Sequence, residues 1–261
     1  MHLNVIELST WLFAGALFAG FLGALTGLGG GVVIVPLLTL VFGIDIRYAI
    51  GASLVSVIAT SSGAASAFVR EGYSNIRIGM VLEIATTLGA LGGAYLGGVL
   101  SSSVIAVVFG LALIYSAYLS LRPRAEHEPA GTSDALAIRL RLPSRYPVNG
   151  EMVEYGVRNV PAGFGLMGLA GVLSGLLGIG SGAVKVLAMD HAMKLPFKVS
   201  TTTSNFMIGV TAAASAGVYL HRGYIEPEIA FPVMLVLLAG LLLGARVLAR
   251  ARTEWLRKLF T

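Results

Sequence analysis

One glycine-rich pattern occurs twice in this chain, at the same place in two very apolar halves. The first copy is Gly27-Leu28-Gly29-Gly30-Gly31 and the second is Gly178-Ile179-Gly180-Ser181-Gly182. A shift of 151 residues superposes them, and without a gap it gives 19 identities in 76 positions between 19–94 and 170–245. Chance would give about 7 for this composition. Glycine breaks at corresponding positions of two hydrophobic halves are typical of secondary transporters, so we expect a small duplicated carrier.

The composition favours a protein that lies in a lipid bilayer. Hydrophobic residues make up 56% of the 261 positions and charged residues 12%, whereas soluble domains carry about 25% charge. Between Arg77 and Arg122, the only acid or base is Glu83. Uncharged runs of this length match transmembrane helices, which need about 20 apolar residues each. The sequence therefore predicts an all-α, multi-pass membrane protein.

The apolar runs have two lengths. Long runs lie near 8–26, 48–69, 78–99, 104–121, 161–179, 203–221 and 229–249, and shorter ones at 32–44 and 183–193 follow the glycine breaks. The two shorter runs are typical of re-entrant or half helices. Broken backbone at membrane depth has to be covered by protein or to line a polar cavity. We therefore expect both breaks at the interface between the two repeats, facing an interior site.

The segment 122–160 differs from both halves, since 11 of its 39 residues are charged. Alternation over 138–142 and the Asn149-Gly150 turn predict a small β-hairpin outside the membrane. We therefore divide the chain into a first transmembrane repeat at 1–121, a cytoplasmic linker at 122–160 and a second repeat at 161–261. The helix at 104–121 has no counterpart after position 255, so the second repeat is expected to lack its last helix.

Arginine and lysine predict the orientation, because cytoplasmic segments are enriched in them. The linker has six arginines and the C-terminal end is also basic, which places both in the cytoplasm. An even number of crossings then separates them, and this rule counts 183–193 as the fourth. Five crossings per complete repeat would relate the halves by an inverted two-fold axis. Arg47 falls on the wrong side of this scheme.

Several motifs together resemble one family. They are the glycine-rich segments 20–31 and 171–182, Pro36, the run Gly51-Ala52-Ser53-Leu54, and Thr201-Thr202-Thr203-Ser204-Asn205 at the equivalent place. The chain is similar in these residues to the TauE/SafE family of permeases, the sulfite and organosulfonate exporters. The resemblance implies a carrier in the cytoplasmic membrane for small anions that commonly contain sulfur. This sequence departs from the pattern at Ser181, where the family has glycine, and at Leu187, the counterpart of Pro36.

The glycine breaks are the first candidate substrate site. A helix that restarts after a break presents free backbone N–H groups and its positive dipole end, which favour anions. The predicted anion-binding residues are Gly29, Gly30, Gly31, Gly180, Ser181 and Gly182. The alternative is that these glycines only allow helices to pack closely.

A hydroxyl-rich cluster is the second candidate. Ser53 and Ser204 are equivalent under the repeat, and Thr202, Thr203 and Asn205 lie around Ser204. Their hydroxyl and amide groups are suited to replace the water around sulfite or a sulfonate. The alternative is helix N-capping, which needs only one such side chain.

Two charged residues complete the candidate site. Lys185 follows the second break by three residues and has Ile34 as its counterpart, so it would add one positive charge beside the anion. Glu83, with Met234 as its counterpart, is the candidate proton-coupling group. Charges inside a membrane are costly and usually functional. The alternatives are a lysine that extends to the interface and a glutamate near enough to its helix start to reach water.

The leading function is a secondary transporter that moves a small anion by alternating access, with proton coupling as an option. A channel-like facilitator on the same scaffold is the second hypothesis. An intramembrane serine hydrolase using Ser181 with His191 or His221 is the third, and it lacks the glycine of a nucleophile elbow, since Ile179 stands there. The absence of cysteine excludes thiolate metal sites, and no cofactor, metal or nucleic-acid partner is expected. A homodimer stays open.

Overall fold

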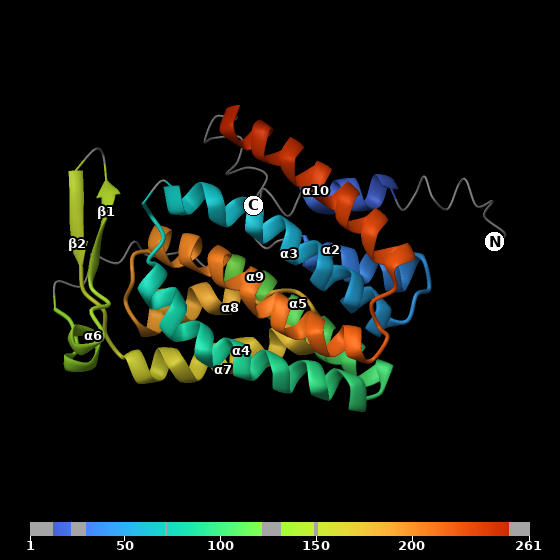
Figure 1. Cartoon of the computed structure of the whole chain (residues 1–261), viewed down its shortest axis with the longest axis horizontal. Coiled ribbons are helices and arrows are strands. Elements are labelled where there is room, and N and C mark those ends of the chain that lie inside the picture. The colour runs from blue at the N-terminus through green and yellow to red at the C-terminus, as the bar shows by residue number, and fades with distance from the viewer. Residues whose placement is uncertain (1–12, 22–29, 71, 122–131, 149–150, 251–261) are drawn as a thin grey trace.

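The computed structural model describes residues 13–21, 30–70, 72–121, 132–148 and 151–250, and these are mostly helical with one small sheet (Figure 1). A helix at 13–21 comes first. The remaining elements are α2 (Gly31–Pro36), η1 (Leu37–Val41), α3 (Ile46–Arg70), α4 (Ile76–Val99), α5 (Ser102–Leu121), α6 (Ala135–Arg139), β1 (Ser144–Val148), β2 (Glu151–Tyr155), α7 (Val160–Leu177), α8 (Gly182–Leu187), η2 (Ala188–Ala192), α9 (Phe197–His221) and α10 (Pro227–Arg250). The elements η1 and η2 are single π-helical turns.

The shift of 151 residues also relates the helix bounds. It carries α2 onto α8, η1 onto η2, α3 onto α9 and α4 onto α10, and each pair begins at corresponding residues. Both π-helical turns form although only the first half has a proline before them, Pro36 against Leu187. This correspondence supports the predicted duplication. The predicted loss of the last helix concerns residues outside the described part of the chain.

Helices α3 and α9 lie antiparallel at the centre of the molecule (Figure 1). Gly51, near the start of α3, is so close to the loop after α9 that an added Cβ would lie 2.2 Å from the carbonyl oxygen of Tyr224. At the other end, the backbone N–H of Asn75, just after α3, donates to Thr203 near the start of α9 over 3.0 Å. Each helix therefore begins where the other one ends.

Two helix pairs pack with almost no side chain between their backbones. A Cβ on Gly171 of α7 would lie 2.1 Å from the carbonyl oxygen of Thr86 in α4. The equivalent contact joins the helix at 13–21 to α10, where a Cβ on Gly20 would lie 2.1 Å from the carbonyl oxygen of Leu237. These glycines serve close helix packing, as small residues do in membrane bundles.

The chain turns back on itself after α7. Gly178, Gly180 and Ser181 have positive φ angles of 66°, 71° and 48°, which reverse its direction before α8 begins. At the end of η2, the carbonyl oxygen of Met193 accepts a hydrogen bond of 3.1 Å from the backbone N–H of Arg158, which precedes α7. The segment 183–193 thus runs back to the end of the bundle at which α7 begins. Its predicted role as a fourth crossing stays a prediction.

The linker contains the predicted β-hairpin, with its strands in another place. Strands β1 and β2 pair antiparallel, with Ser144 opposite Tyr155. The alternating segment 138–142 is wrong as a strand, because α6 and a turn occupy it and bury Leu142. The predicted turn at 149–150 lies outside the described residues. The hairpin contacts the start of α4, where the Nδ2 of Asn75 donates to the hydroxyl of Tyr155 over 2.8 Å.

Polarity is arranged for a lipid environment, with apolar side chains outside and hydroxyls inside. One exposed face of α4 carries Met80, Ile84, Leu88, Leu91 and Tyr95, which we call the apolar stripe. The buried polar residues include Ser53, Ser56, Thr60, Ser174, Ser204, Thr211 and Ser215. By length and composition, α4 and α7 are long and apolar enough to cross a membrane. This distribution is the one expected of a membrane protein.

Candidate functional site

The two glycine breaks meet between α3 and α9. A Cβ on Gly31 would lie 2.7 Å from the Oγ of Ser53 and 3.0 Å from the carbonyl oxygen of Gly178, which belongs to the other break. Gly180 contacts Ile208 of α9, with 2.9 Å between its added Cβ and that side chain. The structure therefore brings together the predicted residues Gly30, Gly31, Gly180, Ser181 and Gly182, which are all buried. Gly29 lies outside the described part of the chain.

The two repeat-related serines hold the second break in place. The Ser53 hydroxyl donates to the carbonyl oxygen of Gly178 over 2.8 Å, and the Ser204 hydroxyl donates to that of Gly182 over 3.3 Å. One hydroxyl comes from α3 and the other from α9, so both central helices fix the same loop. Each hydroxyl proton is used by a break carbonyl, and these serines position the loop.

The threonines beside Ser204 point to different places. Helix α9 begins at Phe197 with Pro196 at its N-cap position, so the capping alternative is wrong for this cluster. Thr202 donates to the carbonyl oxygen of Lys198 in its own helix over 2.9 Å. Thr203 instead accepts from Asn75 near the linker hairpin. Asn205 is half-buried. The predicted cluster is therefore not a single site.

Lys185 and Glu83 meet in the interior through a hydroxyl that bridges them. Lys185 in α8 has 0% exposure, and its Nζ donates to the Oγ1 of Thr211 in α9 over 2.6 Å. The same oxygen lies 2.7 Å from the Oε1 of Glu83 in α4, which also accepts from Thr87 over 3.2 Å. Glu83 is 8% exposed. Lys185 therefore does not extend to the interface, and both charges lie inside the bundle.

Several buried polar atoms around this network have no hydrogen-bond partner among the described residues. They include the Oε2 of Glu83 and the hydroxyls of Ser174 and Ser181. The two serines flank the second break, one on each side. Because buried polar atoms are normally paired, these unpaired atoms are candidates to bind a polar ligand or water.

Sequence reasoning missed Thr211. It is identical to its repeat counterpart Thr60, and a conserved hydroxyl pair inside two apolar segments was the signal that could have found it. Sequence reasoning also treated Lys185 and Glu83 as separate groups, although they share this hydroxyl.

The serine-hydrolase hypothesis finds no support in the geometry. Ser181 is buried, whereas the His191 side chain is 57% exposed and lies 3.9 Å from Asp190. His221 lies at the far end of α9, in a surface hollow. The described residues thus give Ser181 no histidine base.

Comparisons with known proteins identify a family of membrane proteins. The family model described as Sulfite exporter TauE/SafE matches residues 12–261. The probable membrane transporter proteins YunE and YdhB of Bacillus subtilis are 29% and 28% identical, over 91% and 90% of this chain and 88% and 86% of their own lengths. The probable membrane transporter protein MJ0441 of Methanocaldococcus jannaschii is 26% identical over 91% of this chain and 85% of its own length. No solved structure matches the chain.

The family match covers nearly the whole chain, and these relatives are named as membrane transporters. The resemblance predicted from the glycine-rich segments is confirmed, and with it the prediction that the protein is not an enzyme. The chain belongs to the TauE/SafE sulfite exporter family of membrane transporters.

Proposed function

We propose that this protein is a secondary transporter that moves a small anion across the cytoplasmic membrane of a prokaryote by alternating access. The observation that carries the proposal is the fully buried Lys185 beside the meeting point of two broken helices. A buried cation is tolerated when it is paired, and it is a functional group by default inside a membrane. Its carboxylate partner, Glu83, gives it that pairing while no anion is bound.

The chemistry of the site favours an oxyanion. Lys185 has three N–H donors, of which the bond to Thr211 uses one. The unpaired hydroxyl of Ser181, one turn before Lys185, can donate to a second oxygen of the same ligand. A sulfite or sulfonate group has several oxygens and no donor of its own, which suits this set. The sulfite exporter description of the family supports the same substrate class.

Glu83 gives the proposal a coupling step. An anion that binds Lys185 competes with the Glu83 carboxylate for the same positive charge. Protonation of Glu83 removes that competition, so a proton and an anion are bound together and released together. The hydroxyl of Thr211 joins the two groups in one network, over 2.6 and 2.7 Å.

The proposed architecture is a pair of inverted repeats with a re-entrant hairpin in each. It is supported by the antiparallel α3 and α9, by the corresponding helix starts of the two halves and by the return of α8 and η2 to the start of α7. Contacts between the halves also occur in pairs. Arg47 lies over the ring of Tyr224 at 5.7 Å, and the repeat-related Lys198 lies over Tyr73 at 3.7 Å.

The test is transport of sulfite, a sulfonate and a carboxylate into liposomes that contain the purified protein. Lys185→Met should abolish saturable uptake, while Lys185→Arg, which keeps the charge, should retain part of it. Equal activity of the two variants would refute the role of Lys185. Glu83→Gln should abolish uptake driven by a pH gradient and leave exchange of internal for external anion intact. An unchanged dependence on the gradient would refute the coupling role.

A further inference from the structure

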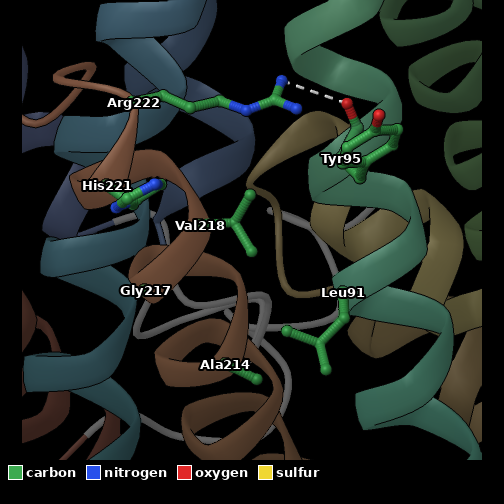
Figure 2. Close-up of a pocket in the computed structure, with 7 residues that line it drawn as sticks. All are labelled: Leu91, Tyr95, Ala214, Gly217, Val218, His221 and Arg222. Carbon is green, nitrogen blue, oxygen red and sulfur yellow. Dashed lines mark hydrogen bonds between the residues drawn. The ribbon is translucent and has the colours of Figure 1, made fainter.

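A surface hollow lies between α4 and α9, away from the buried lysine (Figure 2). Its volume is about 690 Å³, and it is open to the outside. The lining residues are Leu91, Tyr95, Ala214, Gly217, Val218, His221 and Arg222. The inner part is formed by aliphatic side chains and glycine, and the cationic residue lies at one end, as Figure 2 shows. The hollow is therefore amphipathic along its length.

The cationic end is built around Arg222, which follows the last residue of α9. Its Nη1 donates to the backbone carbonyl oxygen of Tyr95 over 3.1 Å, and its guanidinium lies 4.9 Å from the centre of the Tyr95 ring. Gly98 makes this position available, because a Cβ there would overlap Nη1 at 1.0 Å. The bond to Tyr95 uses one of five N–H donors. The arginine is thus held at the rim with donors left for an anion.

The position of the hollow matches the layers of a bilayer. Arg222 lies at a helix end, where headgroups are found, and the apolar lining extends back along α9 to Ala214, about two turns deeper. On α4, Leu91 and Tyr95 belong to the apolar stripe, which faces outward. An occupant in this place would contact headgroups at one end and acyl chains at the other.

We propose that the hollow is a binding site for an anionic phospholipid. One acyl chain lies against Leu91, Ala214 and Val218, and the headgroup phosphate accepts hydrogen bonds from Arg222. Arginine is the preferred partner of phosphate because of its planar set of donors. A single basic residue near an anionic headgroup contributes about a fivefold gain in affinity. The bound lipid would cover the groove between α4 and α9.

The test is binding of phosphatidylglycerol and phosphatidylcholine to the purified full chain in detergent, counted by native mass spectrometry. Wild type should bind one phosphatidylglycerol about fivefold more tightly than phosphatidylcholine, and Arg222→Gln should lose this preference. Gly217→Leu should fill the hollow and displace the lipid, because an added Cβ at Gly217 meets open space. Gly165→Leu is the matched control, because a Cβ added at Gly165 of α7 also meets open space. Equal lipid binding by Gly217→Leu and Gly165→Leu would overturn the proposal.

Two further outcomes would assign the hollow to another occupant. The chain has no cysteine, so Ala214→Cys places a single thiol in the hollow. Rapid reaction of that thiol with a water-soluble, negatively charged thiosulfonate in liposomes would show a water-filled vestibule and overturn the lipid site. A dimeric wild type and a monomeric Gly217→Leu variant would show that a second copy of the chain covers the hollow. That result would also overturn the lipid site. Slow labelling of a monomer supports the lipid.

Discussion

Replacing either Lys185 or Glu83 alone should destabilise the protein far more than replacing both. Lys185→Met leaves Glu83 as an unpaired buried carboxylate, and Glu83→Met leaves Lys185 as an unpaired buried cation. Methionine is the residue found at 234, the counterpart of Glu83, so it is compatible with the same helix position in the other half. The double variant removes both charges and leaves neither one unpaired.

The structure gives the size of the effect. The bridge of 2.6 and 2.7 Å through Thr211 places the two charges about 5 Å apart. At that separation an effective dielectric constant of 20 gives an attraction of about 3 kcal/mol. Removing one partner of a buried pair typically costs 3–5 kcal/mol, whereas replacing both by apolar residues is often neutral. Each single variant should therefore lose about 3–5 kcal/mol of stability.

The assay is thermal unfolding in detergent, followed by circular dichroism of the helices. Each single variant should melt about 10 °C below wild type, and the double variant should recover most of that loss. The coupling energy from the double-mutant cycle, which is the sum of the two single losses minus the loss of the double variant, should be at least about 5 kcal/mol. Thr211→Val, which removes the bridge and keeps both charges, is the control and should also lose stability. Additive losses in the double variant would refute the reasoning, because they would show that the two charges do not stabilise one another.

Three other predictions concern packing and the linker. Gly171→Ala should destabilise the protein by about 1–3 kcal/mol, because its Cβ would meet a backbone carbonyl of α4 at 2.1 Å. Gly165→Ala, on an open face of the same helix, should melt like wild type. Equal melting temperatures of the two variants would contradict the packing argument. Asn75→Ala should lower the free energy of unfolding by about 2 kcal/mol, because Asn75 caps α4 and binds the hairpin. The variant should also expose the linker to limited proteolysis, and an unchanged digestion pattern would contradict this role. Burial raises the pKa of Tyr155 above its ordinary value of about 10, so the stability that its neutral form provides is complete below pH 10 and is lost as the pH rises through the raised pKa. Tyr155→Phe should remove that alkaline loss in melting curves, and an identical pH profile would exclude Tyr155 as its source.

The sequence predicted the elements of this fold better than their contacts. A register of 151 residues already relates the starts of the helices, because the same order of glycine breaks and apolar runs occurs in both halves. The path of 183–193 back to the start of α7 rests on the backbone bond from Arg158 to Met193, a tertiary contact that apolar length does not predict.

The candidate site was predicted in its parts and not in its connections. Lys185 and Ser181 were found because charge and hydroxyl groups are rare beside a glycine break. The pairing of Lys185 with Glu83 could not be predicted, because it depends on how α8 and α4 both lie against α9, and the two residues are more than 100 positions apart. Hydroxyls in apolar helices often donate to their own backbone. Thr202 does so, and its position in the polar run could not show this. The anion itself stays a prediction.

The glycine contacts of α7 with α4, and of the helix at 13–21 with α10, determine which parts of the molecule can move relative to one another. Two backbones in direct contact have no side chains that could change rotamer, so neither partner can slide without breaking the contact. Under the proposed alternating access, we expect each pair to move as one rigid body and the rearrangement to take place between the two bodies. Spin labels placed on α4 and α7 should keep a single distance distribution throughout turnover, while labels on α4 and α10 should show two.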